Sequence, residues 1–230
     1  MKTIGMIGGM SWESSAVYYR IVNREVQRRL GGVHSAKVLM WSFDLAEIEA
    51  LQAAGDWRGA GQRMGEAGRA LAQAGADFLI ICCNTMHILA ETVEDASGLP
   101  LLHIATPLGA AIATRGFRQV GVLGTKYTMK ADFLRSPLVR DHNIDIITPI
   151  EDDAQETHRL IYEELSCGRF LDSSAGFLRA AIRRLADRGA EGVILGCTEL
   201  SILVKPEESE IPLFDTTELH ALAAVDRALA

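Results

Sequence analysis

The stretch that decides the fold spans residues 79–85 and reads Leu79-Ile80-Ile81-Cys82-Cys83-Asn84-Thr85. Its apolar residues run without alternation, which is typical of a parallel strand covered on both faces. The run then turns polar at once, as happens at the carboxyl end of a strand in an open α/β sheet, where ligands bind. The stretch therefore predicts an α/β fold with a functional loop that begins at Cys83.

A second stretch, residues 192–198, repeats this pattern as Gly192-Val193-Ile194-Leu195-Gly196-Cys197-Thr198. Around the two stretches, residues 4–10 match residues 120–125 and residues 103–106 match residues 214–216. The matches come in the same order and at nearly the same spacing, which indicates an internal repeat. We therefore predict two pseudo-symmetric lobes, each a four-stranded parallel sheet flanked by helices, with the active site in the cleft between them.

Short apolar runs alternate with amphipathic stretches along the whole chain, as expected for strand–helix–strand crossovers. Strands are predicted at residues 3–7, 37–42, 77–82, 101–105, 119–123, 144–148, 192–196 and 213–215. Helices are predicted at residues 14–30, 60–73, 153–164 and 175–187. The N-terminal lobe should comprise residues 1–105 with a returning C-terminal helix at 216–230, and the C-terminal lobe residues 106–215.

Composition narrows the class of partner. The 230 residues are 48% hydrophobic and carry a formal charge of −7 without a basic cluster, so neither nucleic acid nor an anionic membrane is an expected partner. No apolar run approaches the roughly 18 residues of a spanning helix, and the opening run is too short for a signal peptide. A cytoplasmic protein with free thiols is therefore expected.

Cys83 and Cys197 are the candidate reactive groups, because each follows a buried-type strand and precedes a helical pattern. A thiol at the start of a helix ionises more readily, and the free backbone N–H groups there can hold a carboxylate. Cys82 and Cys167 have no such matched setting and are interpreted as structural. His87, His103 and Glu199 lie near the motifs. As lone polar residues they are interpreted as structural first, with tuning of the thiols as the alternative.

Other readings of the same residues are weaker. A zinc site could use Cys83 and His87, four residues apart, but Cys197 has no neighbouring His or Cys to complete it. A redox dithiol lacks the C-x-x-C spacing. The glycine turns at Gly8 and Gly124 fit neither nucleotide fingerprint and instead allow the backbone to approach a small ligand. No metal is expected.

Three motifs carry a resemblance to a known family: Gly-Gly-Met-Ser-Trp at 8–12, Cys-Asn-Thr-Met-His at 83–87 and Gly-Cys-Thr-Glu at 196–199. With them the chain resembles the aspartate/glutamate racemase family, and within it the bacterial aspartate racemases and broad-specificity amino-acid racemases. The resemblance implies an amino-acid racemase that needs no cofactor and forms a homodimer. One cysteine would remove the Cα proton while the other protonates the opposite face.

The resemblance also implies substrate contacts, for which the matching positions are Met10, Asn84, Thr85 and Thr198, with Gln52 a weaker match. Two departures bear on the substrate. Glutamate racemases carry His where Glu199 stands, and members acting on acidic substrates carry a Lys in the segment that matches residues 163–168, where this chain has none. A side-chain carboxylate would then need another cation, such as Lys126 or Arg58.

Two other kinds of function fit the same sequence. A non-catalytic protein that binds amino acids or carboxylates could also use two lobes. A hydantoin racemase, a maleate-isomerase-like cis–trans isomerase or an arylmalonate decarboxylase would share the fold. The complete pair of cysteine motifs favours racemisation of amino acids.

Overall fold

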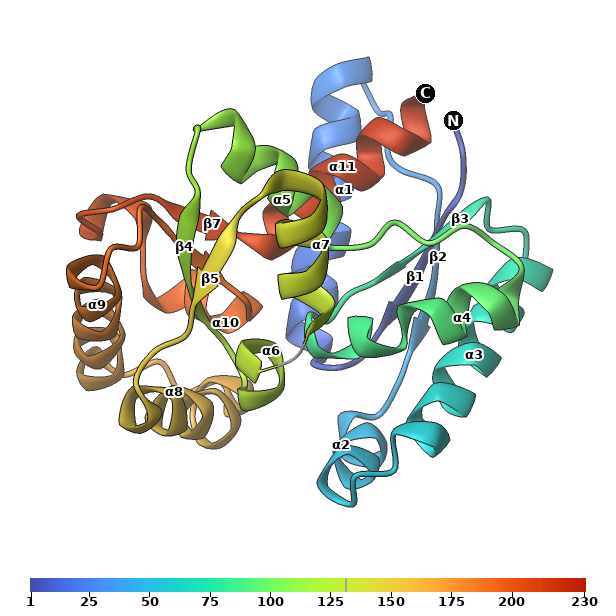
Figure 1. Cartoon of the computed structure of the whole chain (residues 1–230). Helices are drawn as coiled ribbons and strands as arrows, with labels where there is room; N and C mark the ends of the chain where they lie inside the picture. The colour runs from blue at the N-terminus through green and yellow to red at the C-terminus, as the bar shows by residue number, and fades with distance from the viewer. Residues whose placement is uncertain (131) are drawn as a thin grey trace. The chain divides into compact units, whose positions relative to one another are not determined.

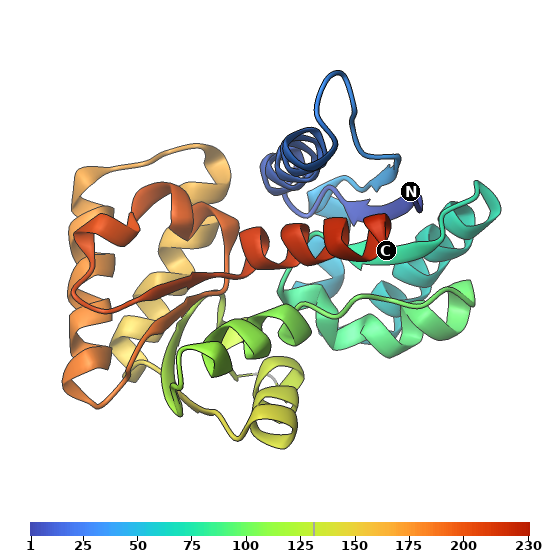
Figure 2. The same cartoon turned by 90° about the horizontal axis from the view of Figure 1, so that it is seen from above.

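The computed structural model describes residues 1–130 and 132–230, and these fall into two compact units. Unit 1 comprises Met1–Ile104 with His220–Ala230, and unit 2 comprises Ala105–Leu219. The last helix, α11 (Thr216–Leu229), is one continuous helix whose first turn belongs to unit 2 and whose remainder belongs to unit 1 (Figure 2). Within the described part of the chain, no helix has both the length and the apolar character needed to cross a bilayer.

Unit 1 is built on a parallel sheet with the strand order β2-β1-β3 (Figure 1). Its strands are β1 (Ile4–Gly8), β2 (Val38–Ser42) and β3 (Phe78–Ile81). Its helices are α1 (Trp12–Leu30), α2 (Leu45–Ala53), α3 (Trp57–Gln73), η1 (Thr85–Leu89) and α4 (Ala90–Ser97), together with most of α11. Apolar side chains of α1 and α11 pack on one face of the sheet, and those of α2, α3 and α4 on the other.

The prediction of a fourth strand at residues 101–105 was wrong. Only Leu101 forms an isolated parallel bridge, to Leu79, and the chain then enters helix α5 (Ala105–Thr114). Pro107 explains the difference, because proline suits the first turn of a helix but cannot donate to a strand ladder. The first sheet therefore has three strands.

Unit 2 is built on a four-stranded parallel sheet with the order β5-β4-β6-β7. Its strands are β4 (Gln119–Leu123), β5 (Asp145–Ile147), β6 (Val193–Leu195) and β7 (Leu213–Asp215). Its helices are α5, α6 (Lys126–Lys130), α7 (Asp132–His142), α8 (Glu151–Glu163), η2 (Leu165–Cys167), α9 (Asp172–Asp187), α10 (Thr198–Leu203) and η3 (Pro206–Glu208). Leucines and isoleucines of α8 and α9 form the core with β4 and β6.

The two sheets share a strand order. In each, the first strand in sequence lies centrally between the second and the third, so β1, β2 and β3 take the places of β4, β5 and β6. The predicted α/β class with parallel sheets flanked by helices is thereby confirmed. Cys83 and Cys197 consequently follow equivalent strands, β3 and β6, at the carboxyl edge of their own sheets.

Candidate active site

The two neighbouring cysteines after β3 face opposite sides of the first sheet. Cys82 is fully buried with the side chains of α1 and α11, whereas the partly buried Cys83 packs against the cluster formed with α2, α3 and α4. The alternation follows from the two-residue period of an extended chain. Burial raises the pKa of the Cys82 thiol, and Cys83 adds to that effect. Cys82 is therefore a core residue whose thiol ionises less readily than an exposed one.

The backbone of Cys83 is held by His87 from the next helical turn. Nδ1 of His87 lies 2.9 Å from the carbonyl oxygen of Cys83. Since a carbonyl only accepts, Nδ1 carries the proton and donates it. Burial lowers the pKa of His87 well below its usual value, and the neighbouring His103 and His220 lower it further, so the ring is neutral.

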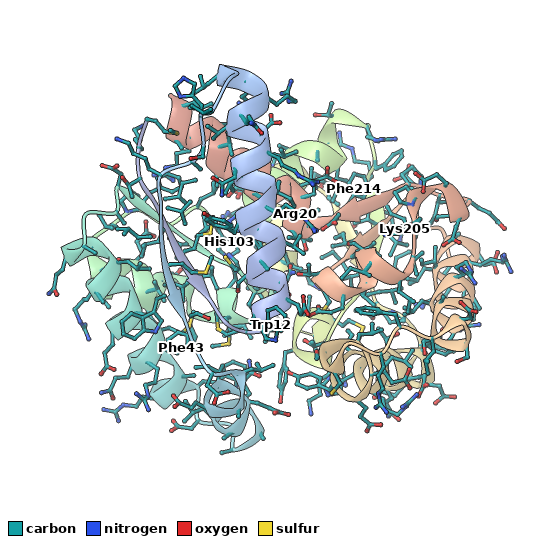
Figure 3. The ribbon with its side chains drawn as sticks, turned by 180° about the vertical axis from the view of Figure 1, so that it is seen from behind. Trp12, Arg20, Phe43, His103, Lys205 and Phe214 are labelled. Carbon is teal, nitrogen blue, oxygen red and sulfur yellow. The ribbon has the colours of Figure 1, made fainter. Side chains whose placement is uncertain are left out.

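His87 belongs to a group of three histidine rings in unit 1. Its ring centroid lies 4.8 Å from that of His103, which is labelled in Figure 3, and 5.5 Å from that of His220. His220 Nε2 donates to the Leu102 carbonyl at 2.8 Å, and its Nδ1 accepts from the Tyr18 hydroxyl at 2.9 Å. Burial lowers the pKa of His220 to about 4 and also lowers that of His103.

The three histidines are held by contacts within the protein. Across residues 1–130 and 132–230, no cluster of His, Cys, Asp and Glu has the arrangement to hold a metal ion. In His220 both ring nitrogens already take part in hydrogen bonds within the protein, and one ring nitrogen of His87 does so. The group thus ties the Cys83 turn to α1 and α11.

The loop after β1 adds Met10 to the apolar cluster against which Cys83 packs. Gly9 has φ +86°, and its N–H donates to the Ser15 hydroxyl at 2.8 Å. Met10, 7% exposed, packs in the same cluster as Cys83. Gln52 of α2 approaches the cluster from another side, with Nε2 3.0 Å from Met86 Sδ. The structure therefore gathers Met10, Cys83 and the Gln52–Met86 pair around one apolar core.

In unit 2, Cys197 is the N-cap residue of α10 and is partly buried. Its thiol lies 2.8 Å from Glu199 Oε2, and Glu199 is only 4% exposed. Thr198 Oγ1 lies 3.1 Å from Thr217 Oγ1 at the start of α11. A thiol, a carboxyl group and two hydroxyls thus lie together at the carboxyl edge of the second sheet.

The turn after β4 lies against the Cys197 turn. A Cβ on Gly196 would lie 2.7 Å from Thr128 Cγ2, so the two turns touch at this glycine. Thr125 and Thr128 are both buried, and their hydroxyl oxygens lie 3.2 Å apart. This threonine pair follows β4 as the Gly9–Met10 loop follows β1, and there Met10 brings an apolar side chain instead.

With this geometry established, comparison with known proteins assigns the family. The family model described as Asp/Glu/Hydantoin racemase matches residues 7–224. The chain belongs to the Asp/Glu/hydantoin racemase family. The family and the relatives below are racemases, which are isomerases.

The chain is similar in sequence to proteins that are named as racemases. It is 24% identical to the broad specificity amino-acid racemase RacX of Bacillus subtilis over 160 residues, which are 70% of this chain and 68% of RacX. It is 29% identical to a glutamate racemase of Roseiflexus over 161 residues, which are 68% of this chain and 56% of that protein.

Solved structures match this racemase-family chain over its full length. A Yersinia pestis protein provisionally assigned as an Asp/Glu racemase is 46% identical, with a TM-score of 0.93 and full coverage of both chains. An aspartate racemase homologue from Pyrococcus horikoshii is 31% identical, with a TM-score of 0.84 and full coverage of both. Glutamate racemase from Francisella tularensis, at 15% identity and a TM-score of 0.65, shares the fold.

The cationic side chains of this chain differ in whether they form ion pairs. Arg159 forms ion pairs with Glu156, Glu163 and Glu164, so its positive charge is already balanced by carboxylates of the protein. Lys126 lies 5.1 Å from the Tyr127 ring centroid and forms no ion pair within the described residues. It directly follows Thr125 at the carboxyl edge of the second sheet. Arg58 is exposed on α3 in unit 1.

Sequence reasoning missed part of this site. Thr125, Thr128 and Thr217 were not among the candidates, although Thr125 occupies the position that matches Gly9 and Thr217 follows the last predicted strand. The sequence positions of Thr125 and Thr217 could therefore have marked both residues as candidates. The contact of Thr128 with Gly196 joins residues 68 positions apart and left no local signal.

Proposed function

We propose that this chain is an amino-acid racemase without a cofactor, in which Cys83 and Cys197 act as opposed acid/base groups at Cα. The observation that carries the proposal is the equivalent placement of the two thiols. Each follows the third strand of a parallel sheet, and the two sheets have the same strand order. Membership of the racemase family supports the same chemistry.

The proposed reaction moves one proton on and one proton off. A thiolate on one face takes the Cα proton, and the electron pair of the broken C–H bond is delocalised into the carboxyl group. The thiol on the other face donates its proton to Cα, which inverts the centre. Because mirror-image substrates need bases on opposite faces, a repeated fold supplies one base from each unit. We accordingly propose residues 1–105 with 216–230 and residues 106–215 as two pseudo-symmetric lobes with the substrate between them.

Polar groups near the two thiols are the proposed substrate contacts. Asn84 and Thr85 directly follow Cys83, and Thr198 directly follows Cys197 at the start of α10. Backbone N–H groups at such helical starts hold carboxylates well. On the Cys83 side, Met10 would add an apolar contact and the Gln52 amide a polar one, in keeping with their place around the same core.

The decisive experiment follows deuterium from heavy water into Cα. Incubation of the protein with each L-amino acid in turn should give the deuterated D-enantiomer for at least one of them, measured by chiral chromatography with mass detection. Comparing aspartate and glutamate with neutral amino acids separates an acidic from a broad specificity. The Cys83→Ala/Cys197→Ala double variant is the control and should show no exchange. Tight binding of one enantiomer without any isotope exchange would instead establish a binding protein.

We further propose a homodimer in the cytoplasm. None of the cysteines at positions 82, 83, 167 and 197 forms a disulfide within the described residues, which suits a reducing compartment. Strand β2 is an edge strand, and its Met40 and Trp41 are 39% and 42% exposed. A second copy would cover such an edge. Sedimentation equilibrium of the wild type and of Trp41→Lys tests this, with dissociation of the variant as the expected result.

A further inference from the structure

Glu199 and Cys197 form a close pair whose chemistry goes beyond the two-thiol scheme. Cys197 Sγ lies 2.8 Å from Glu199 Oε2, and the side chains are two residues apart in the first turn of α10. The geometry fits a thiol that donates its proton to the carboxylate. By contrast, the exposed Cys167 thiol points at a backbone carbonyl, that of Tyr162, at 3.7 Å.

The burial of Glu199 makes this pairing significant. The residue is 4% exposed, and carboxylates are rarely so buried without a specific partner. A negative charge on Glu199 also disfavours a second negative charge on the neighbouring sulfur. In this arrangement the thiol is the donor and the carboxylate is the acceptor.

We propose that Glu199 is a catalytic residue that accepts the thiol proton of Cys197 as its sulfur takes the Cα proton of the substrate. This inference rests on the proposed racemase function and extends it. It replaces the interpretation of Glu199 as a structural residue that the sequence alone favours.

The protons balance through a full inversion. At the start, the Cys197–Glu199 pair holds one proton and Cys83 is a thiol, so the three groups carry one negative charge. The S–H bond of Cys197 breaks as its proton moves to Glu199 Oε2, and the Cα–H bond breaks as that proton moves to Cys197 Sγ. Cys83 then gives its proton to the opposite face of Cα and becomes the thiolate. The pair now holds two protons, and the single negative charge has moved to Cys83.

A merely structural role makes a different prediction. An acidic side chain in the first turn of a helix interacts favourably with the helix dipole, and its loss would lower the free energy of unfolding. That role would leave the reactivity of the Cys197 thiol unchanged. The two roles are therefore separated by measuring thiol chemistry alongside turnover.

The test is Glu199→Gln, which keeps the size of the side chain and an acceptor oxygen but cannot take up a proton near neutral pH. We expect kcat for deuterium exchange to fall by about 10²-fold or more, since that is the usual contribution of a positioned acid/base group. We also expect iodoacetamide to alkylate Cys197 about 3- to 10-fold faster at pH 7, because the neutral amide no longer disfavours the thiolate. Peptide mass spectrometry reads Cys197 and Cys167 in one digest.

Controls make each outcome decisive. The alkylation rate of Cys167 should not change, and the exposed Glu207→Gln should match the wild type in both assays. Glu199→Asp, which restores a carboxylate, should recover part of the exchange rate. The inference is overturned if Glu199→Gln keeps kcat within about 3-fold of the wild type, or if exchange is lost while Cys197 alkylation stays unchanged. A wild type without exchange on any amino acid overturns the racemase function itself, and the alkylation result still decides whether Glu199 and Cys197 are coupled.

Discussion

The turn at Cys83 and the turn at Cys197 end equivalent strands, yet their surroundings have little chemistry in common. Behind Cys83 lie neutral imidazoles, with His87 bonded to the Cys83 carbonyl and His220 bonded to Tyr18. Beside Cys197 lie a buried carboxyl group and threonine hydroxyls. The two sheets thus place a cysteine after the same strand of a shared strand order, whereas the residues that surround each cysteine differ.

The largest effect should come from the thiols themselves and should be equal on the two sides. Cys83→Ser and Cys197→Ser should each lower the rate of deuterium exchange by about 10²–10⁴-fold, since a hydroxyl is a far weaker base than a thiolate. Quench-flow or overnight exchange assays in heavy water cover this range. The exposed Cys167→Ser is the matched control and should keep the wild-type rate. Full activity in either variant would refute the proposed role of the cysteine that it lacks.

The glycines after β1 and β4 should differ in what they tolerate. Gly9 has φ +86°, and a Cβ there would overlap the backbone nitrogen and oxygen of Phe43. Gly9→Ala should therefore lower the free energy of unfolding by about 3 kcal/mol or prevent folding. At Gly124 a Cβ would come within 3.1 Å of the Thr128 side chain, so Gly124→Ala should cost about 1 kcal/mol.

Urea unfolding followed by circular dichroism gives both values. A Gly9→Ala protein as stable as Gly124→Ala would mean that the loop after β1 can move away from Phe43. The loops after β1 and β4 would then be equivalent in packing as well as in position.

The parts of the fold that could be predicted from the sequence are those that depend on the pattern of neighbouring residues in the chain. Residues 119–123 and 213–215 are strands with the predicted bounds, because continuous apolar runs bounded by polar turns are specific. The predicted strand at 101–105 failed because its apolar run leads into Pro107, and the start of α5 takes over. Short helices such as α10 have too few residues to show a period.

The sequence singled out candidate site residues mainly where the repeat marked them. Cys83 and Cys197 stand at matched positions, so each supported the other. Glu199 has no such counterpart, and its burial against Cys197 depends on how α10 packs. The histidine group could not be predicted from the sequence, because His220 hydrogen-bonds to the carbonyl of Leu102, which is 118 residues away. Contacts at that separation are set by tertiary packing, which leaves no period or spacing in the chain.

The buried His220 of unit 1 should make the protein less stable in weak acid. Burial holds the pKa of His220 at about 4 in the folded protein, against an ordinary value of 6.5. As the pH falls below about 6.5, the unfolded chain takes up a proton that the folded chain refuses, so the free energy of unfolding falls by up to about 3 kcal/mol by pH 4. Urea unfolding from pH 7 to pH 4 measures the slope.

Replacing His220 by Gln should flatten this slope, whereas His34→Gln, at an exposed position, should leave it unchanged. An equally steep slope in both variants would place the sensitivity in groups other than His220, such as His87, whose pKa burial also lowers.

The smallest effect is expected from His87, which acts on Cys83 only through the backbone. His87→Phe keeps a ring of similar volume but removes the Nδ1–H that donates to the Cys83 carbonyl at 2.9 Å. We expect kcat to fall by about 10-fold with KM little changed, because the thiol is displaced but its protonation chemistry is intact. Cys83 alkylation at pH 7 should stay within about 2-fold of the wild type, unlike the faster alkylation of Cys197 in Glu199→Gln. If His87→Phe instead changed Cys83 alkylation as strongly, His87 would act on the proton of its thiol, and the two turns would work by one principle.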